Sequence, residues 1–289
     1  MLVDRFGRVV KHLRISVTSK CNMSCIYCHN EGMSEVGEDM DLDEIVEICK
    51  VFYKLGVEKV KITGGEPLIR RDIVEIVSEM PRFKEISLVT NGYYLSKYAY
   101  ELKEAGLDRV NVSLDTLNPE RYKFITGVDG LDRVLDGIES AYDAGLTPIK
   151  LNMVVMSINE DEIWELLDFT SKFNRSGINV ILQLIEVINS CYYVSLEKIE
   201  DKFRKITSVV ITRNLHARRQ YVFGNLAVEF VRPFHREFCM NCTRIRVTSD
   251  GKIKPCLMSK VYVNARGLRG EELLNAIKKA VELRRPWKI

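Results

Sequence analysis

The chain has 289 residues, of which 46% are hydrophobic and 29% are charged, and its formal net charge is +3. This length is enough for one large domain with an appendage or for two modest domains. The charge is too mild for nucleic-acid binding by bulk attraction, so a small anionic ligand held by a few placed cations is expected instead.

The N-terminus has no apolar core of the kind found in signal peptides, and no apolar run approaches the length that spans a bilayer. We therefore expect a cytoplasmic protein with no membrane partner. In that compartment the eight cysteines are expected to bind metal rather than to form disulfides.

Strands and helices alternate strictly through the first two thirds of the chain. The predicted strands cover 13–17, 57–63, 85–90, 109–115, 149–156 and 178–188. The predicted helices cover a segment from the acidic capping signal at 41–44 to Gly56, then 69–80, a segment that ends at Gly106, 131–144 and 161–173. Such alternation predicts parallel strands joined by right-handed crossovers. Because six units are too few for a complete eight-stranded barrel, the expected fold class is α/β, a partial (β/α)6 TIM-type barrel with its functional rim where strands end and helices begin.

Beyond residue 189 the alternation stops. The segments expected there are a helix over 197–206, short antiparallel strands over 208–231, a hairpin that turns at Asp250-Gly251 and a last helix over 271–283. The sequence therefore predicts two domains, a barrel over 1–190 and a small C-terminal region over 191–289.

Three cysteines, Cys21, Cys25 and Cys28, directly follow the first predicted strand. Their intervals of three residues and then two differ from the paired C-x2-C hooks of common structural zinc sites. Three thiolates are also one short of the four that close a [4Fe–4S] cluster, which would leave one iron open to a ligand. The pattern suggests a reactive cluster, and the alternative is a zinc site completed by His29.

A second triplet lies in the C-terminal region and consists of Cys239, Cys242 and Cys256. By its spacing alone, this triplet also fits a zinc ribbon with His235 close by. Of the other two cysteines, Cys49 lies on the apolar face of a predicted helix and is expected in the core, and Cys191 receives no role.

The first triplet, with Tyr27 before its last cysteine and Gly64-Gly65-Glu66-Pro67 at the end of the next strand, resembles the radical S-adenosylmethionine (radical SAM) superfamily. The second triplet, in the setting Thr243-Arg244-Ile245-Arg246, Ser249-Asp250-Gly251 and Pro255, is similar to the MoaA family, the GTP 3′,8-cyclases that begin molybdenum cofactor synthesis. The match runs from about residue 11 to 257. It includes the segments 13–18, 61–68, 70–72, 90–92, 111–115 and 150–152.

The resemblance implies a radical SAM lyase with two [4Fe–4S] clusters and S-adenosylmethionine (SAM) as cofactors. The metal ligands would be Cys21, Cys25, Cys28, Cys239, Cys242 and Cys256. The residues in contact with SAM would be Tyr27, Gly64, Gly65, Glu66 and Ser113, where glycines without a Cβ allow the backbone to approach a ligand. The residues in contact with GTP would be Arg14, Lys61, Thr90, Lys150, Arg244 and Arg246, with Lys59 as a further candidate on the strand face of Lys61.

The residue types agree with this assignment, because a cation on a barrel strand is costly to bury without an anionic partner. The alternative for Arg14, Lys61 and Lys150 is an ion pair inside the barrel with Glu66 or Asp115. For the two arginines beside the second triplet, the alternative is a solvated strand edge. Three positions depart from the family pattern: Val89 replaces a frequent threonine, Gln183 an arginine and Ile188 a methionine.

By resemblance, an external electron donor of the flavodoxin or ferredoxin type would reduce the first cluster, and cleavage of SAM would give a 5′-deoxyadenosyl radical. That radical would remove hydrogen from C3′ of GTP, and the carbon radical would attack C8 of the guanine. The product, (8S)-3′,8-cyclo-7,8-dihydroguanosine 5′-triphosphate, would pass to a cyclic pyranopterin monophosphate synthase.

Two alternatives remain open from the residues. One is another two-cluster radical SAM enzyme that acts on a peptide or a tetrapyrrole, and the cationic set argues against it because those charges suit a triphosphate. The other is a non-catalytic iron–sulfur or zinc protein, which would have no need for the Gly-Gly-Glu-Pro turn.

Overall fold

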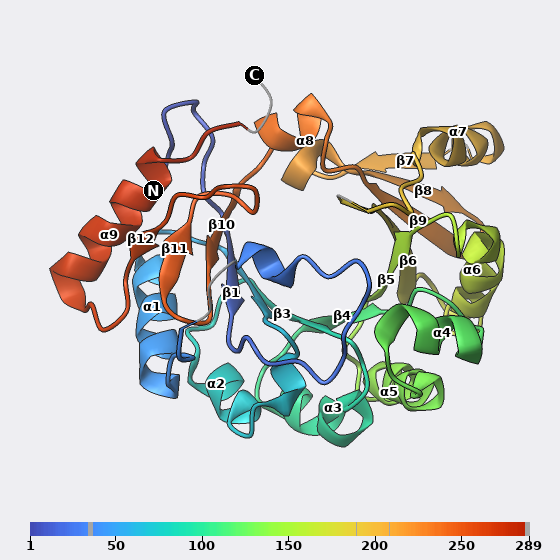
Figure 1. The fold of residues 1–289 in the computed structure, drawn as a ribbon, viewed down its shortest axis with the longest axis horizontal. Coiled ribbons are helices and arrows are strands. Elements are labelled where there is room, and N and C mark those ends of the chain that lie inside the picture. The colour runs from blue at the N-terminus through green and yellow to red at the C-terminus, as the bar shows by residue number, and fades with distance from the viewer. Residues whose placement is uncertain (34–36, 189, 208, 287–289) are drawn as a thin grey trace.

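One curved sheet organises the chain and bends around a central space (Figure 1). The structure, a computed structural model, describes residues 1–33, 37–188, 190–207 and 209–286. Within these residues, twelve strands pair in the order β12-β11-β10-β1-β2-β3-β4-β5-β6-β9-β8-β7.

The middle of this sheet contains the six predicted strands. They are β1 (His12–Ser16), β2 (Lys59–Thr63), β3 (Glu85–Thr90), β4 (Arg109–Ser113), β5 (Ile149–Val155) and β6 (Val180–Glu186). Each strand pairs in parallel with the next, which confirms the partial (β/α)6 barrel. Because the strands are parallel, their carboxyl ends and the loops that follow them meet at one rim.

Helices follow these strands and cover the outer face of the sheet (Figure 1). The helices that the sequence predicts are α1 (Leu42–Lys54), α2 (Ile73–Glu79), α3 (Leu95–Glu104), α5 (Leu131–Asp143) and α6 (Ile163–Ser171). Helix α4 (Pro119–Thr126) was not predicted; Asn118 caps its first turn and Gly127 ends it with a φ of 76°. Short 3-10 turns lie at η1 (Asn30–Gly32), η2 (Pro67–Ile69), η3 (Glu160–Glu162) and η4 (Leu215–Ala217).

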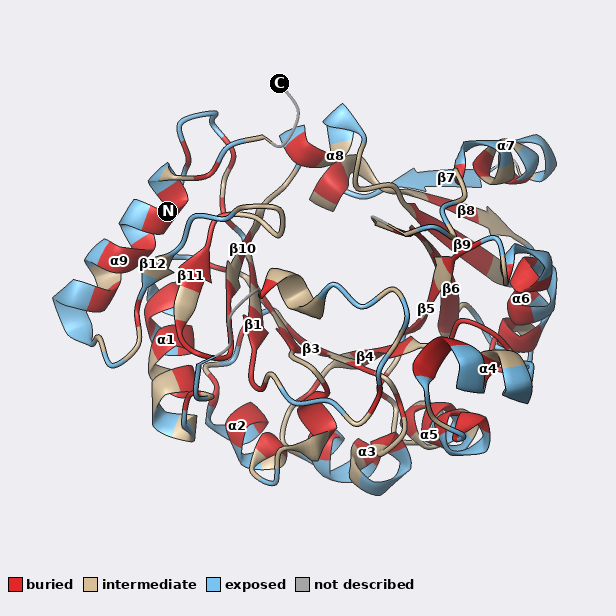
Figure 2. Ribbon diagram, in the orientation of Figure 1, coloured by how far each residue is buried: buried red, intermediate tan, exposed pale blue. Residues whose placement is uncertain are grey.

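Alternation along the strands separates the apolar core from the central space. Leu13, Ile15 and Ile62 are at most 1% exposed and belong to the hydrophobic core. Figure 2 shows buried residues along the strands and on the sides of the helices that face the sheet. Burial of each such side chain stabilises the fold by about 1.5–3 kcal/mol. The residues between them point the other way, so Arg14 and Lys61 line the cavity inside the sheet.

The C-terminal region extends the sheet at both ends. Strand β9 (Leu226–Val231) pairs in parallel with β6, and β10 (Arg244–Val247) pairs in parallel with β1. The other elements are β7 (Val209–Thr212), β8 (Arg219–Phe223), β11 (Lys252–Lys254), β12 (Val263–Asn264), α7 (Glu197–Ile206), α8 (Arg236–Met240) and α9 (Gly270–Glu282). The antiparallel strands predicted over 208–231 are present in β7 to β9, while residue 208 lies outside the described residues. The domain boundary at residue 190 stays a prediction.

Two smaller predictions are confirmed. Gly251, with a φ of 83°, lies in the turn of the hairpin between β10 and β11, and Cys49 on α1 is fully buried in the core. Among the described helices, none is both long enough and apolar enough to cross a membrane.

Helix α1 begins with a capping box, in which the Asp41 carboxylate accepts the Glu44 N–H at 2.8 Å and the Glu44 carboxylate accepts the Asp41 N–H at 3.1 Å. Asp41→Ala should lower the free energy of unfolding by about 1 kcal/mol, because it leaves a helix N–H without a partner. Asp43→Ala, in the same first turn but without a capping bond, should cost only a few tenths of a kcal/mol, about the value of a charge near the helix dipole. Chemical denaturation measures both, and equal losses would contradict the capping role.

Candidate functional site

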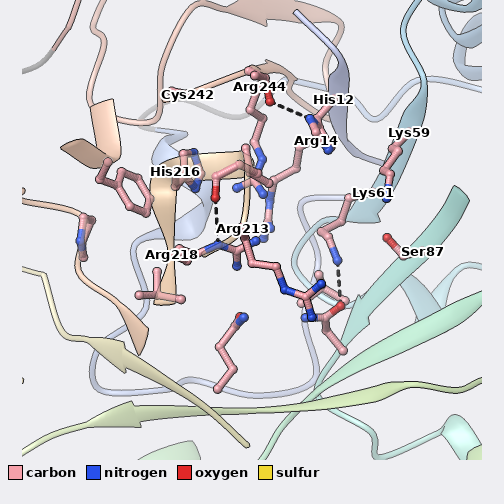
Figure 3. A pocket seen from close by; sticks show the side chains of 18 of the residues that line it. His12, Arg14, Lys59, Lys61, Ser87, Arg213, His216, Arg218, Cys242 and Arg244 are labelled. Atoms are coloured by element: carbon pink, nitrogen blue, oxygen red, sulfur yellow. Dashed lines mark hydrogen bonds between the residues drawn. The ribbon is translucent and has the colours of Figure 1, made fainter. Parts of the chain in front are cut away.

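A cavity of about 800 Å³ lies inside the curve of the sheet (Figure 3). The inward faces of the parallel strands form one wall, and segments 211–218, 238–246 and 255–258 form the other. Six of the seven predicted nucleotide contacts line it: Arg14, Lys59, Lys61, Lys150, Arg244 and Arg246. The seventh, Thr90, is buried behind the wall, where its hydroxyl donates to the Glu66 carboxylate at 2.7 Å. Its neighbour Val89 lines the cavity in its place.

Two of the predicted arginines share one carboxylate. Glu31 accepts Arg14 Nε at 2.9 Å and Arg246 Nη1 at 2.6 Å. Burial alone would raise the pKa of Glu31, but the two guanidiniums outweigh it and hold that pKa below its usual range. One internal anion is therefore divided between two cations, which leaves positive charge in excess.

Lys61 and Arg244 have less compensation still. Lys61 Nζ donates to Asn111 Oδ1 at 2.7 Å, and within the described residues no carboxylate forms an ion pair with it. The side chain of Arg244 has no hydrogen bond or ion pair with any residue that the structure describes, although its backbone belongs to β10. Burial, together with Arg109 for Lys61 and Arg14 for Arg244, lowers the pKa of both cations well below their usual values. Such cations are costly in an empty cavity, so the site fits an anionic ligand.

A second carboxylate, Glu229 on β9, is fully buried and has three side-chain donors within 3 Å. It accepts Lys150 Nζ at 2.5 Å, Gln183 Nε2 at 2.7 Å and Arg218 Nη1 at 2.6 Å, and Arg213 Nε lies at 3.8 Å. Burial opposes ionisation of Glu229, but the cations around it lower its pKa. Glu229 thus fixes the directions of cations that also reach the cavity.

Several cavity residues were not predicted from the sequence. Arg109, Arg213 and Arg218 add positive charge, and Arg109 could have been found because it alternates with Asn111 on one strand face. Arg213 and Arg218 lie around the irregular turn η4 and carry no comparable signal. Lys59 and Arg109 share one carboxylate, Glu85, at 3.0 Å and 2.6 Å.

Three imidazoles, those of His12, His29 and His216, also face this space, and burial lowers the pKa of each. The Nδ1 atom of His12 lies 2.7 Å from Thr243 Oγ1, and burial with the charge of Arg244 lowers the pKa of His12 to about 3. His216, which has a φ of 65°, stacks on Phe238 with ring centroids 3.7 Å apart. These rings bring polar and aromatic surface to the wall without adding charge.

The ion-pair alternative named the wrong carboxylates. Glu66 accepts Leu68 N–H, Asn91 N–H and the Thr90 hydroxyl, so it joins the loops after β2 and β3 and does not pair with a cation. Burial raises the pKa of Glu66 to about 7. Asp115 accepts the Tyr27 hydroxyl at 2.6 Å and the Val154 N–H, and burial raises its pKa to about 6. Among the described residues, the carboxylates that pair with cavity cations include Glu31, Glu85 and Glu229.

The first cysteine triplet lies on the loop after β1, and none of the eight cysteines, all of them described, forms a disulfide. Burial, Asp115 and the two neighbouring thiols raise the pKa of Cys25 to about 12. Backbone N–H groups lie 3.4 Å from two of the sulfurs, Met23 N from Cys21 and Asn30 N from Cys28. Three sulfurs whose thiolate forms repel one another, two of them close to N–H groups, fit an iron–sulfur cluster, which binds thiolates and is tuned by such hydrogen bonds.

Gly64 and Gly65 hold this loop against the end of β2. A Cβ on Gly65 would lie 2.1 Å from Lys20 O, and a Cβ on Gly64 would lie 2.5 Å from Thr18 O. The close approach that needs glycine here is to the chain's own loop, and not to a ligand as the sequence predicted. Ser113, another predicted SAM contact, ends β4 opposite Asn152.

The second triplet faces the cavity. Cys239 in α8, Cys242 just after it and Cys256 after β11 all line the wall beside Arg246. In the described residues, no group of three or more Cys, His, Asp or Glu side chains is arranged around a single metal ion. The donor set of three thiols with cations beside them suits a negatively charged cluster.

Glu229→Gln should destabilise the protein by about 3 kcal/mol at neutral pH, because Lys150 and Arg218 lose their shared counter-ion. Since the pKa of Glu229 is lowered by folding, its contribution is present above the ordinary glutamate pKa and is lost as the pH falls toward the lowered value. The difference between variant and wild type should therefore shrink on acidification. Thermal and chemical unfolding measure it.

Asp201→Asn, at an exposed pair with Arg204, is the control and should change stability by less than about 1 kcal/mol. A Glu229→Gln protein as stable as wild type would show that the cations do not depend on this carboxylate.

Comparison with known proteins agrees with this geometry. A family model described as Radical SAM superfamily matches residues 15–170, and one described as Molybdenum Cofactor Synthesis C matches residues 189–288. A probable GTP 3′,8-cyclase of Archaeoglobus fulgidus is 48% identical over 293 residues and covers 99% of both chains. One of Pyrococcus abyssi is 46% identical over 310 residues, also with 99% of both chains covered.

Among solved structures, native anSMEcpe with bound AdoMet superposes with a TM-score of 0.64 at 16% identity, over 96% of this chain and 84% of that one. This likeness shows the shared radical SAM fold. The chain belongs to the radical SAM superfamily and, within it, to the family of GTP 3′,8-cyclases.

Proposed function

We propose that the protein converts GTP to (8S)-3′,8-cyclo-7,8-dihydroguanosine 5′-triphosphate, the first step of molybdenum cofactor biosynthesis. The single observation that carries this proposal is the group of undercompensated cations, Lys61 and Arg244 above all, in one cavity with three cysteines. The full-length relatives named as probable GTP 3′,8-cyclases support it. A triphosphate matches this charge better than a peptide or a tetrapyrrole does.

Membership of the radical SAM superfamily implies a [4Fe–4S] cluster and SAM. Cys21, Cys25 and Cys28 would hold that cluster, and SAM would lie at the rim formed by the loops after β1 and β2. When bound, these groups supply the carbon radical that begins the reaction. Tyr27 is fixed by its hydrogen bond to Asp115, so it would support the cluster loop from the β4 side.

The chain's own contribution at the cavity is to bind and orient the nucleotide. Arg14, Lys61, Lys150, Arg244 and Arg246 would hold the triphosphate, with Arg218 as an addition from the structure. Burial strengthens each charge-assisted hydrogen bond relative to water. Positioning of this kind brings the ribose to one place and keeps water out, which is the protein's share of the rate enhancement.

Cys239, Cys242 and Cys256 would hold a second [4Fe–4S] cluster, with one iron left open toward the purine. This assignment fits their place on the cavity wall next to Arg246. An external donor of the flavodoxin or ferredoxin type would supply the electron, and a cyclic pyranopterin monophosphate synthase would take the product.

Anaerobic reconstitution with SAM, dithionite and GTP tests the proposal when 5′-deoxyadenosine and cyclised nucleotide are assayed together. Wild type should form both. Cys256→Ser should still cleave SAM but form no cyclised nucleotide, because it loses a ligand of the second cluster. Cys191→Ser, at an exposed cysteine outside both triplets, is the control and should form both products. Deoxyadenosine without consumption of GTP in wild type would remove GTP as the substrate.

Lys61→Met should weaken GTP binding about 10- to 100-fold, the effect of one charge-assisted hydrogen bond. The same change should raise the stability of the nucleotide-free protein, because it removes a buried cation that has no carboxylate partner. Lys59→Met on the same strand face provides the comparison: Lys59 is paired with Glu85, so its loss should not stabilise the free protein. Equilibrium binding and denaturation measure the two effects. Weaker binding without a gain in stability would show that Lys61 is compensated in the free protein.

A further inference from the structure

A buried group of three charged residues joins the two ends of the described chain. Asp4 and Arg8 lie in the first turn of the chain, next to the bridge between Val3 and Val9, and Arg284 follows α9. Arg8 Nε lies 2.8 Å from Asp4 Oδ2, and Arg284 Nη1 lies 3.0 Å from the same oxygen. The side chains of all three are at most 7% exposed.

The two guanidiniums extend beyond the carboxylate to the second cysteine triplet. Arg8 Nη1 donates to the carbonyl of Cys239 at 2.9 Å, and Arg284 Nη2 donates to the carbonyl of Cys242 at 2.5 Å. The segment after α9 runs toward α8, where these cysteines lie (Figure 1). Both ends of the chain thus bond to the backbone of two proposed cluster ligands.

The charges of this group do not balance. Within the part of the chain that the structure describes, two arginines accompany one carboxylate, so the group carries one positive charge in a buried place. A role confined to joining the termini would be met by a single arginine paired with Asp4. The second guanidinium indicates an anion next to Cys242.

We propose that Asp4, Arg8 and Arg284 are positioning residues that fix the backbone of Cys239 and Cys242 and balance the negative charge of the second cluster. This inference rests on the second cluster of the proposed function. A reduced cluster carries one more electron than an oxidised one, so a nearby positive charge favours reduction. Arg284→Met should therefore lower the reduction potential of the second cluster, and Asp4→Asn should raise it.

The experiment is an anaerobic EPR redox titration of the full-length protein with both clusters loaded, with iron analysis of each sample. The signal that changes on addition of GTP reports the second cluster, and the signal that changes on addition of SAM reports the first. The expected result is opposite shifts of the second potential in Arg284→Met and Asp4→Asn, with the first potential unchanged. Arg284→Lys keeps the charge, so its second potential should lie close to the wild-type value.

Arg82→Met is the matched control, because Arg82 also donates to a carbonyl, that of Gly106, and pairs with Asp108 far from either triplet. It should leave both potentials unchanged. Shifts of the same sign in Arg284→Met and Asp4→Asn, or no shift in either, would overturn the charge-balancing role. A wild-type protein that binds only about four irons has one cluster, and that result would remove the second cluster of the proposed function.

Discussion

The structure depends on one electrostatic constraint, an excess of buried positive charge inside the barrel. A buried cation without a partner costs several kcal/mol, and a whole domain is stable by only about 5–15 kcal/mol. The fold can therefore leave only a small part of this charge uncompensated. Glu31, Glu85 and Glu229 supply internal counter-ions for most of it, and Lys61 and Arg244 are the part that remains. A bound polyanion would complete the balance.

Alternation of side chains along the parallel strands makes this arrangement possible. Ile15 and Ile62 secure the strands against the helices, while Arg14 and Lys61 on the same strands point inward. The apolar face stabilises the sheet independently of the cations, so the cavity can be charged without loss of the core. The positive charge that the strands contribute to the cavity could therefore be predicted from the sequence, once the strands were recognised.

The sequence predicted local features well and long-range pairings poorly. The strands and the capping box at Asp41 follow from periodicity and short-range hydrogen bonding, and the structure confirms both. The predicted counter-ions were wrong. Glu66 and Asp115 were the candidates, but their carboxylates accept hydrogen bonds from backbone N–H groups and hydroxyls instead of pairing with cations. Glu229 could not be found from the sequence, because its role depends on β9 pairing with β6. That pairing joins segments more than forty residues apart and leaves no local pattern.

Segment 30–32 is the physical link between the two cysteine triplets. Glu31 joins the loop of the first triplet to Arg246 on β10, and Lys254 Nζ donates to the Gly32 carbonyl from β11, two residues before Cys256. Gly32 has a φ of 76°, and a Cβ there would lie 2.6 Å from Leu257 O, so the two loops pack backbone to backbone. Radical chemistry requires the reacting carbon to lie close to the radical source. Because this segment contacts both loops, it sets the spacing between the place where the radical would form and the place where the nucleotide would bind.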